Sequence, residues 1–209
     1  YPGALNSLYD ASENGSLDII QGSISCVELD NITGKLLLSR ELKGNMVHIG
    51  DYSGHEIFSS FMKFNISGVL WGKLIKKELY NKSFSLIPKE LGITLSEDNY
   101  LFFYISLFAT SYRGICNNVL NYRIDTGITK NKIIDSLNDF NRIIHAAKVF
   151  VNLKKFMEDN PEYFSKKDYK SFQNHFSWTY NKTKDSLNYV IPEIKKEAET
   201  IFLEAWNEN

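Results

Sequence analysis

Cysteine, net charge and long apolar runs are all scarce in this sequence, and each scarcity excludes a class of protein. The 209 residues include two cysteines, Cys26 and Cys116, which are far apart and lack a metal-ligand spacing. We expect both to be buried free thiols of a cytoplasmic protein, which excludes a disulfide-stapled secreted domain. The formal net charge is -1, so nothing in the overall charge favours nucleic acid as a partner.

No apolar run approaches the roughly 20 residues that a membrane-spanning helix requires. The sequence nevertheless contains enough apolar material for a folded core. Hydrophobic residues make up 43% of the chain and aromatic residues 14%, which argues against disorder. The length fits one large domain, or one domain with an appendage.

Helical and alternating patterns share the chain up to about residue 129. We expect a helix over residues 4–9, then a hairpin made of strands over 17–29 and 35–40. Ser53 and Glu56 have the spacing of a capping box, which predicts a short amphipathic helix directly after them. Further along, Arg113 and Gly114 predict a turn, and the turn should lead into a strand over residues 115–123.

Strand signals vanish after about residue 129, and helical periodicity replaces them. The expected helices cover roughly 130–159, ended by Pro161, then about 166–189, and finally 193–207. This extension has no catalytic motif, and its two histidines, at 145 and 175, are expected on the surface or in packing. Its polar faces mix both signs of charge, whereas interfacial membrane helices usually have a basic bias. Packing or self-association is therefore the expected role.

Two adjacent carboxylates, Glu97 and Asp98, directly precede an apolar run over residues 100–108. Ser96 is a good N-cap residue, so a helix should begin near Glu97 with both acids in its first turn. There the unpaired backbone N–H groups and the helix dipole favour ionised carboxylates. A fixed, ionised carboxylate suits a general base. The structural alternative is helix stabilisation alone, worth about 0.3–1 kcal/mol for each acid.

Four motifs follow one another over the first 130 residues. They are residues 2–9 with 17–22, residues 71–79, Glu97 with Asp98, and residues 120–123 with 126–129. In this order and spacing they resemble the second half of a bacterial glycosyltransferase of family 2, the inverting type with a GT-A fold. The resemblance implies an α/β fold: residues 1–129 would be the acceptor-side half of the mixed sheet with flanking helices, and residues 130–209 an all-helical extension.

The first half of that family's fold has no counterpart here. It holds the nucleotide-binding strands and the Asp-x-Asp motif, which binds a divalent metal, Mg or Mn, on the sugar nucleotide. No Asp-x-Asp occurs in this sequence, and the chain begins with Tyr1. We therefore expect a piece of a longer enzyme that is inactive alone and binds no metal alone.

The resemblance assigns the chemistry to Asp98, as the base that deprotonates the acceptor hydroxyl, with Glu97 orienting the acceptor or capping the helix. The intact enzyme would use a nucleotide-sugar donor and a carbohydrate or lipid-linked acceptor in surface polysaccharide or glycoconjugate synthesis. It would work in the cytoplasm or at the inner face of the membrane. A glycosidase is disfavoured, because adjacent helical residues point ~100° apart and cannot flank one bond.

Further residues are candidates for substrate binding, each with a structural alternative. Trp71 could stack on a sugar ring or lie in the core. Lys73 could reach a phosphate or remain solvated, and a solvated face is expected for Lys76 and Lys77.

The strand end with Tyr122 and Arg123 adds two more candidates. Arg123 could bind the diphosphate through two hydrogen bonds, although an ion pair with Asp125 would also explain it. His48, in a loop, could touch a ligand. A homo-oligomer and a peripheral membrane association both stay open as partners.

A second hypothesis treats the chain as a non-catalytic module whose helices mediate assembly. The Glu97 and Asp98 pair would then be a helix cap only. The reading frame upstream distinguishes the two: a strand-rich stretch with an Asp-x-Asp, ~90 residues long by ordinary domain sizes, supports the enzyme.

Overall fold

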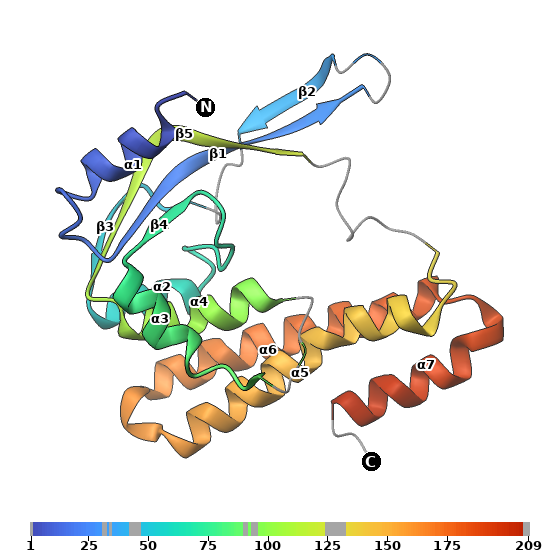
Figure 1. Ribbon diagram of the computed structural model, residues 1–209. Coiled ribbons are helices and arrows are strands. Elements are labelled where there is room, and N and C mark those ends of the chain that lie inside the picture. The colour runs from blue at the N-terminus through green and yellow to red at the C-terminus, as the bar shows by residue number, and fades with distance from the viewer. Residues whose placement is uncertain are drawn as a thin grey trace. The chain divides into compact units, whose positions relative to one another are not determined.

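The computed structural model describes residues 2–30, 33, 35–41, 47–89, 92, 96–123 and 133–206. The chain is mixed α/β and divides into two compact units, drawn in Figure 1. The first unit comprises Tyr1–Leu86 and Leu101–Ile128, and the second comprises Ile87–Tyr100 and Thr129–Asn209. The segment before Leu101 thus groups with the helical residues, and one helix, α4 (Glu97–Phe108), begins in that segment and continues into the first unit.

Five described strands form one mixed sheet in the first unit. Its order is β2 (Leu36–Glu41), β1 (Ile19–Leu29), β5 (Ser111–Arg123) and β3 (Gly50–Ser53), while the short β4 (Lys73–Ile75) pairs with the beginning of β1. The central pair, β1 and β5, is parallel, and the other pairings are antiparallel. Parallel neighbours need a long crossover, and here the connection contains three helices. β1 is buried along most of its length, as a central strand requires.

Helices cover the sheet of the first unit. α1 (Ala4–Ala11) packs on β1 and β5, where Leu8 meets Ile20 and Val119 in a small apolar cluster. In Figure 1, α2 (His55–Met62) and α4 lie beyond the opposite face. Edge-to-face ring pairs join these two helices, with ring centroids 5.1 Å apart for Phe58 with Phe103 and for Phe61 with Phe102.

The expected hairpin of β1 and β2 is confirmed, and so is the helix near the beginning of the chain. The capping box at Ser53 is wrong. The N-cap of α2 is Gly54, which has a φ of 53° and makes no side-chain cap. Its backbone N–H instead donates to the carbonyl of Thr110 at 2.9 Å, so a tertiary contact replaces the local one.

The turn expected at Arg113 and Gly114 is also wrong, because both residues lie inside β5. Gly114 is required for a different reason. A Cβ atom at this position would lie 1.6 Å from the carbonyl oxygen of His48, because the His48 backbone passes directly over the strand. Close approach of two backbone segments, not a turn, explains this glycine.

Both cysteines are free thiols. Cys26 in β1 is buried, as expected, whereas Cys116 in β5 is exposed, so the prediction of burial is wrong for it. Cys116 lies where the register of β5 shifts against β1: Gly22 pairs with Ile115, and the next residue of β1, Ser23, pairs with Asn118. Such bulges leave the extra residues of one strand without a partner opposite.

The second unit contains α5 (Leu137–Asp159), α6 (Lys166–Ser186) and α7 (Pro192–Ala205). α6 lies within its expected range, α7 begins one residue before its range, at Pro192, and α5 starts later than residue 130. Its N-cap is Ser136, whose hydroxyl accepts a hydrogen bond from the backbone N–H of Asp139. Ile134, just before this cap, forms a parallel bridge with Val190 instead of continuing the helix backward. Across the described residues, no helix combines the length and the apolarity that crossing a bilayer needs.

Candidate functional site

The expected helix with two acids in its first turn is present, since α4 begins at Glu97. The carbonyl of Ser96 accepts the first helical hydrogen bond, from Tyr100 N–H at 3.0 Å. Ser96 has a φ of 66°, a left-handed conformation that is uncommon for a residue with a side chain. Glu97 is exposed and Asp98 is half-buried. The turn before the acids is therefore strained, and the carboxylate of Asp98 is partly shielded from water.

Trp71 and Tyr122 lie face to face in the first unit. Their ring centroids are 4.7 Å apart and their planes differ by 9°. Both residues are half-buried, so the stacked pair is neither core nor free surface. Two predicted binding residues from different motifs thus form one aromatic platform, Trp71 from the segment before β4 and Tyr122 from near the end of β5.

Gly72 explains why Trp71 is held at this place. It has a φ of 76°, which a residue with a side chain rarely adopts, and a Cβ atom there would lie 3.0 Å from Cδ1 of Ile24. Its carbonyl accepts a hydrogen bond from Gly22 N–H at 3.0 Å. The Trp71–Gly72 turn is therefore fastened to β1, next to the bulge of β5.

Lys73 has a structural task in this turn. Its Nζ donates to the carbonyls of Ser67, at 2.9 Å, and Val69. The ammonium also lies over the Phe102 ring of α4, 4.6 Å from the ring centroid. The lysine is therefore directed into the protein, and its contacts fix the loop that leads to Trp71. Its predicted contact with a substrate phosphate stays a prediction.

Arg123 is exposed at the end of β5, next to Tyr122 in the platform. Its alternative partner, Asp125, lies outside the described residues. The side chain thus occupies the strand end predicted for it, and binding of a diphosphate there stays a prediction.

His48 lies away from the aromatic platform, near the beginning of β5. Its imidazole stacks on Tyr52 with centroids 4.1 Å apart, and its Nδ1 lies 3.3 Å from the Tyr52 hydroxyl. The His48 backbone crosses β5 at Gly114, which pairs with Gln21 of β1. Tyr122 pairs with Cys26, five residues further along β1. At ~3.4 Å per residue, about 17 Å separate the two places. The structure thus does not bring His48 to Trp71.

A buried hydroxyl lies beneath the His48 segment. The Tyr112 oxygen is 3.1 Å from the His48 carbonyl and 3.1 Å from Oε1 of Gln21. Burial raises the pKa of Tyr112 above its ordinary value, despite the hydrogen bond to His48 and with a smaller contribution from Tyr52. The neutral phenol therefore serves as a fixed hydrogen-bonding group at this place.

Two charged clusters were not expected from the sequence. In the first, the Asp18 carboxylate accepts hydrogen bonds from the Thr110 N–H and hydroxyl, both at 2.7 Å, and lies 3.5 Å from Lys76 Nζ. Burial of Asp18 raises its pKa, but the Thr110 and Lys76 interactions outweigh burial and hold the pKa below its ordinary value. The cluster joins the starts of β1 and β5. Because Thr110 and Lys76 engage the Asp18 carboxylate, we assign it a structural role.

In the second cluster, Arg113 binds Asp51 with two hydrogen bonds, Nε to Oδ1 at 2.8 Å and a terminal nitrogen to Oδ2 at 2.9 Å. Its other terminal nitrogen reaches Glu13 at 2.8 Å. These contacts lower the pKa of Asp51. The guanidinium joins β5, β3 and the end of α1, and no local sequence pattern could have indicated partners so far apart in the chain.

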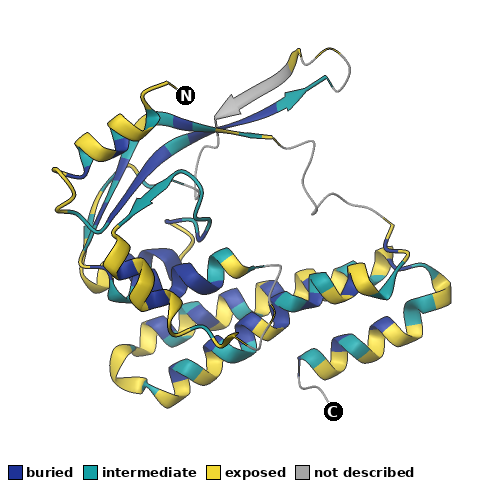
Figure 2. Cartoon of the chain, in the orientation of Figure 1, coloured by how far each residue is buried: buried dark blue, intermediate teal, exposed yellow. Residues whose placement is uncertain are grey.

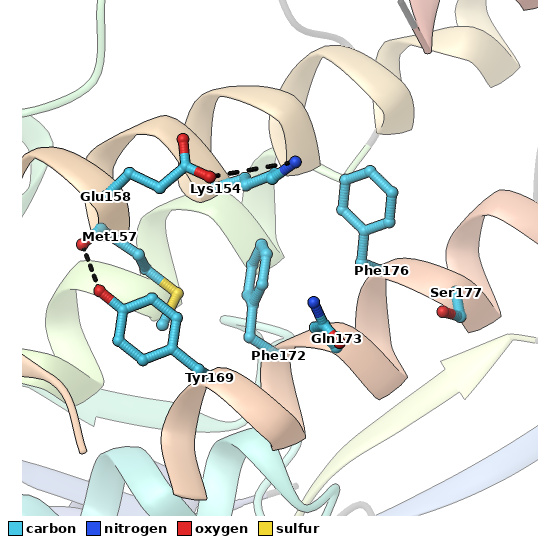
Figure 3. Close-up of a pocket in the computed structure, with 8 residues that line it drawn as sticks. All are labelled: Lys154, Met157, Glu158, Tyr169, Phe172, Gln173, Phe176 and Ser177. Carbon is cyan, nitrogen blue, oxygen red and sulfur yellow. Dashed lines mark hydrogen bonds and ion pairs between the residues drawn. The ribbon is translucent and has the colours of Figure 1, made fainter. Parts of the chain in front are cut away.

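The second unit contains a shallow groove between α5 and α6, drawn in Figure 3. Its volume is about 280 Å³, near the lower limit for small-molecule pockets, about 300–1,000 Å³. The Tyr169 hydroxyl donates to the Met157 carbonyl at 2.7 Å, and Lys154 lies 3.9 Å from Glu158 at the rim. The polar groups on this groove are therefore largely engaged with each other, and the site offers no cluster of catalytic side chains.

The part of the chain that the structure describes has no group of three His, Cys, Asp or Glu side chains placed to hold a metal ion. The described residues thus do not fit the divalent metal that the resemblance implies for the intact enzyme, and no chemical step is derived through it. A scan of the chain against models of protein families gives no match, and a search of curated proteins finds no relative. The family resemblance therefore depends on the four sequence motifs.

Proposed function

We propose that this chain is the acceptor-side half of an inverting, nucleotide-sugar-dependent glycosyltransferase with a GT-A fold, followed by a helical extension. The intact enzyme would act in the synthesis of a surface polysaccharide or glycoconjugate. The observation that carries this proposal is the stacked pair of Trp71 and Tyr122. The two residues are distant in the sequence and come from separate motifs of the resemblance, and the folded chain brings them into contact.

The proposed reaction needs one base. The acceptor hydroxyl oxygen attacks the anomeric carbon of the donor sugar while its proton passes to the Asp98 carboxylate. The bond from the anomeric carbon to the diphosphate oxygen breaks on the opposite face, and the nucleoside diphosphate leaves with that electron pair. The product linkage then has the inverted configuration. Arg123 can neutralise charge that develops on the leaving diphosphate.

The placement of Asp98 supports its role as the base. The first turn of a helix such as α4 stabilises an ionised carboxylate through its backbone N–H groups and the helix dipole. Asp98 is partly buried, and the left-handed Ser96, two residues before it, is a strained residue of the kind that often accompanies functional sites. A general base needs both a charge and a defined position.

The aromatic platform supplies the proposed acceptor contact. A sugar has apolar C–H faces, and a half-buried indole with an adjacent phenol offers both a flat surface and a hydroxyl for hydrogen bonding. Lys73 acts as a positioning residue, since its hydrogen bonds fix the loop that carries Trp71. In this role it contributes to acceptor binding without touching the sugar.

The test is turnover of a nucleotide sugar by the full-length protein with the nucleotide-binding half present. Proton NMR of the product should show the anomeric configuration opposite to that of the donor. Trp71→Ala should raise the KM for the acceptor about tenfold. Truncating an aromatic side chain that contacts a ligand typically costs roughly 1–3 kcal/mol of binding free energy. The matched control is Trp178→Ala, an exposed tryptophan of α6, which should leave KM unchanged.

Retention of configuration would exclude the inverting mechanism. If the protein transfers no sugar from a panel of donors to a panel of acceptors, and binds none of the donors, a non-catalytic assembly module is the better account. An equal rise in KM for Trp71→Ala and Trp178→Ala would remove the aromatic platform from acceptor binding.

A further inference from the structure

α3 (Lys77–Phe84) directs two aromatic rings into solvent. Tyr80 is 38% exposed and Phe84 is 56% exposed. Their positions, four residues apart, place them on one side of the helix, where the rings are nearly parallel at 7° with centroids 6.1 Å apart. Leu86, just after the helix, is 38% exposed. Two stacked aromatic rings on a solvent-facing helix are an apolar surface with no core function.

The buried side of α3 adjoins this face and fixes the orientation of the helix. Leu79 and Ser83 are its buried residues, and the remaining positions of the helix are exposed, as the colouring of Figure 2 shows. Lys82, on a different side from Tyr80, reaches the Phe108 ring of α4 with its Nζ 3.9 Å from the ring centroid. The helix is therefore anchored at two places, and the aromatic face cannot turn inward by a simple rotation.

Basic residues accompany the rings on that face. Lys77 precedes Tyr80 by three positions and Phe84 by seven, so the three residues form one stripe along α3. Lys76, at the N-cap, borders the stripe, with its Nζ 3.5 Å from Asp18. Glu78, the acid of this helix, falls on the other side, because it lies two positions from Tyr80. The exposed apolar stripe thus contains the basic residue Lys77, whereas the charge of Lys76 is paired with Asp18.

We propose that the stripe of Lys77, Tyr80 and Phe84 binds an anionic phospholipid surface. Aromatic side chains favour the level of the lipid headgroups, and tyrosine can keep its hydroxyl in water there. Lysine stems lie along apolar surface while their ammonium groups meet anionic headgroups. The positive charge of Lys77 on the stripe complements an anionic membrane and not a neutral apolar partner. This inference does not depend on the transferase activity.

α1 provides an internal comparison. It also exposes an apolar pair on one side, Leu5 at 75% and Tyr9 at 52%, but its only charged residue is Asp10. The two helices therefore expose similar apolar surface and differ in charge. The proposal assigns lipid binding to α3 and none to α1.

The experiment is flotation of the full chain with vesicles of phosphatidylcholine mixed with phosphatidylglycerol, and with vesicles of phosphatidylcholine alone. Binding should occur with the mixed vesicles and fall steeply at about 1 M salt, where the screening length is ~3 Å. The double variant Tyr80→Ser with Phe84→Ser should lower the partition coefficient about tenfold or more. Lys77→Glu should lower it about thirtyfold, since it reverses a charge at the surface.

The matched control is Leu5→Ser with Tyr9→Ser, which should bind the mixed vesicles as well as the unchanged chain. All these side chains are exposed, so circular dichroism should show the same folded structure for every variant. Equal loss of binding in the α1 and α3 variants would overturn the proposal. A dimer in sedimentation experiments that Phe84→Ser dissociates, with no vesicle binding, would also overturn it and assign the stripe to a second copy of the chain.

Discussion

The indole of Trp71 stacks on the phenol ring of Tyr122 with a centroid separation of 4.7 Å and nearly parallel planes. Trp71 is held by the Gly72 turn against β1, and Tyr122 is held by its place in β5. The contact therefore depends on two separate parts of the chain adopting their positions at the same time. It is both a structural contact of the first unit and the centre of the proposed acceptor site.

A double-mutant cycle on this pair should measure its energy. Trp71→Leu and Tyr122→Leu should each destabilise the first unit, and the double variant should lose less than the sum, with a coupling of about 0.5–1.5 kcal/mol for stacked rings. Urea unfolding followed by circular dichroism provides the free energies. A coupling near zero would mean that the rings do not stack in solution.

Gly22 and Val119 form a second testable pair. A Cβ atom on Gly22 would lie 2.4 Å from Cγ1 and 2.5 Å from Cγ2 of Val119, and the nearest clashing atoms all belong to that valine. Gly22→Ala alone should cost about 1–3 kcal/mol of unfolding free energy from overpacking. Adding Val119→Ala should restore part of that loss, because the space for the new methyl group is then vacant.

The control for this pair is Gly22→Ala combined with Val190→Ala, a buried valine of the second unit. These two residues belong to different compact units, so their costs should add. Full additivity of Gly22→Ala with Val119→Ala would contradict the close packing of β1 on β5 described above.

His175 of α6 predicts a pH dependence of stability. Burial lowers its pKa from 6.5 to about 4 in the folded protein. Between these values the unfolded chain binds a proton that the folded chain does not, so the contribution is fully present above pH 6.5 and is lost as the pH falls toward 4. The maximum loss lies between about 3 and 4 kcal/mol, because the pKa falls from 6.5 to about 4 and each unit corresponds to ~1.4 kcal/mol.

Urea unfolding of the second unit over this pH range, compared between the natural chain and His175→Asn, should isolate the effect. The variant should be less stable at neutral pH and show a weaker fall below it. His145→Gln is the matched control, as His145 is only half-buried, and it should alter the pH dependence less. An NMR titration that gives His175 an ordinary pKa would contradict its burial.

Strong local signals made part of the fold predictable. Asp30 begins a turn cluster between two alternating runs, and the β1–β2 hairpin follows from it. Ser96 with two following acids and an apolar run indicated where α4 begins. Pro161 follows the end of α5 and Pro192 begins α7, because proline is unfavourable inside a helix but tolerated in its first turn.

Short and tertiary features could not be predicted. β3 and β4 have four and three residues, too few for an alternating pattern to be recognised, and they exist because β5 and β1 offer edges to pair with. The helix expected from residue 130 begins seven residues later, at Leu137, although Ser136 with Asp139 is a cap signal that could have placed it. Gly114 has a spatial reason, the crossing backbone of His48, that no local pattern contains.

The candidate site likewise contains residues that the sequence indicated and contacts that only the folded chain reveals. Trp71 and Tyr122 came from the resemblance, and no spacing in the sequence says that they meet. His48 was grouped with them although the sheet separates it from them. The charged clusters at Asp18 and Arg113 join residues far apart in the chain, so only the folded sheet makes them visible.

The transfer rate of the Asp98→Asn variant, measured in the intact transferase that we propose, tests the central proposal most directly. Asparagine keeps the size of the side chain but cannot accept the acceptor proton, so kcat should fall about a hundredfold to ten-thousandfold, the range for loss of a general base, while donor binding stays intact. Glu97→Gln, the exposed neighbour, should lose far less. Turnover of Asp98→Asn at the rate of the natural enzyme would contradict the account.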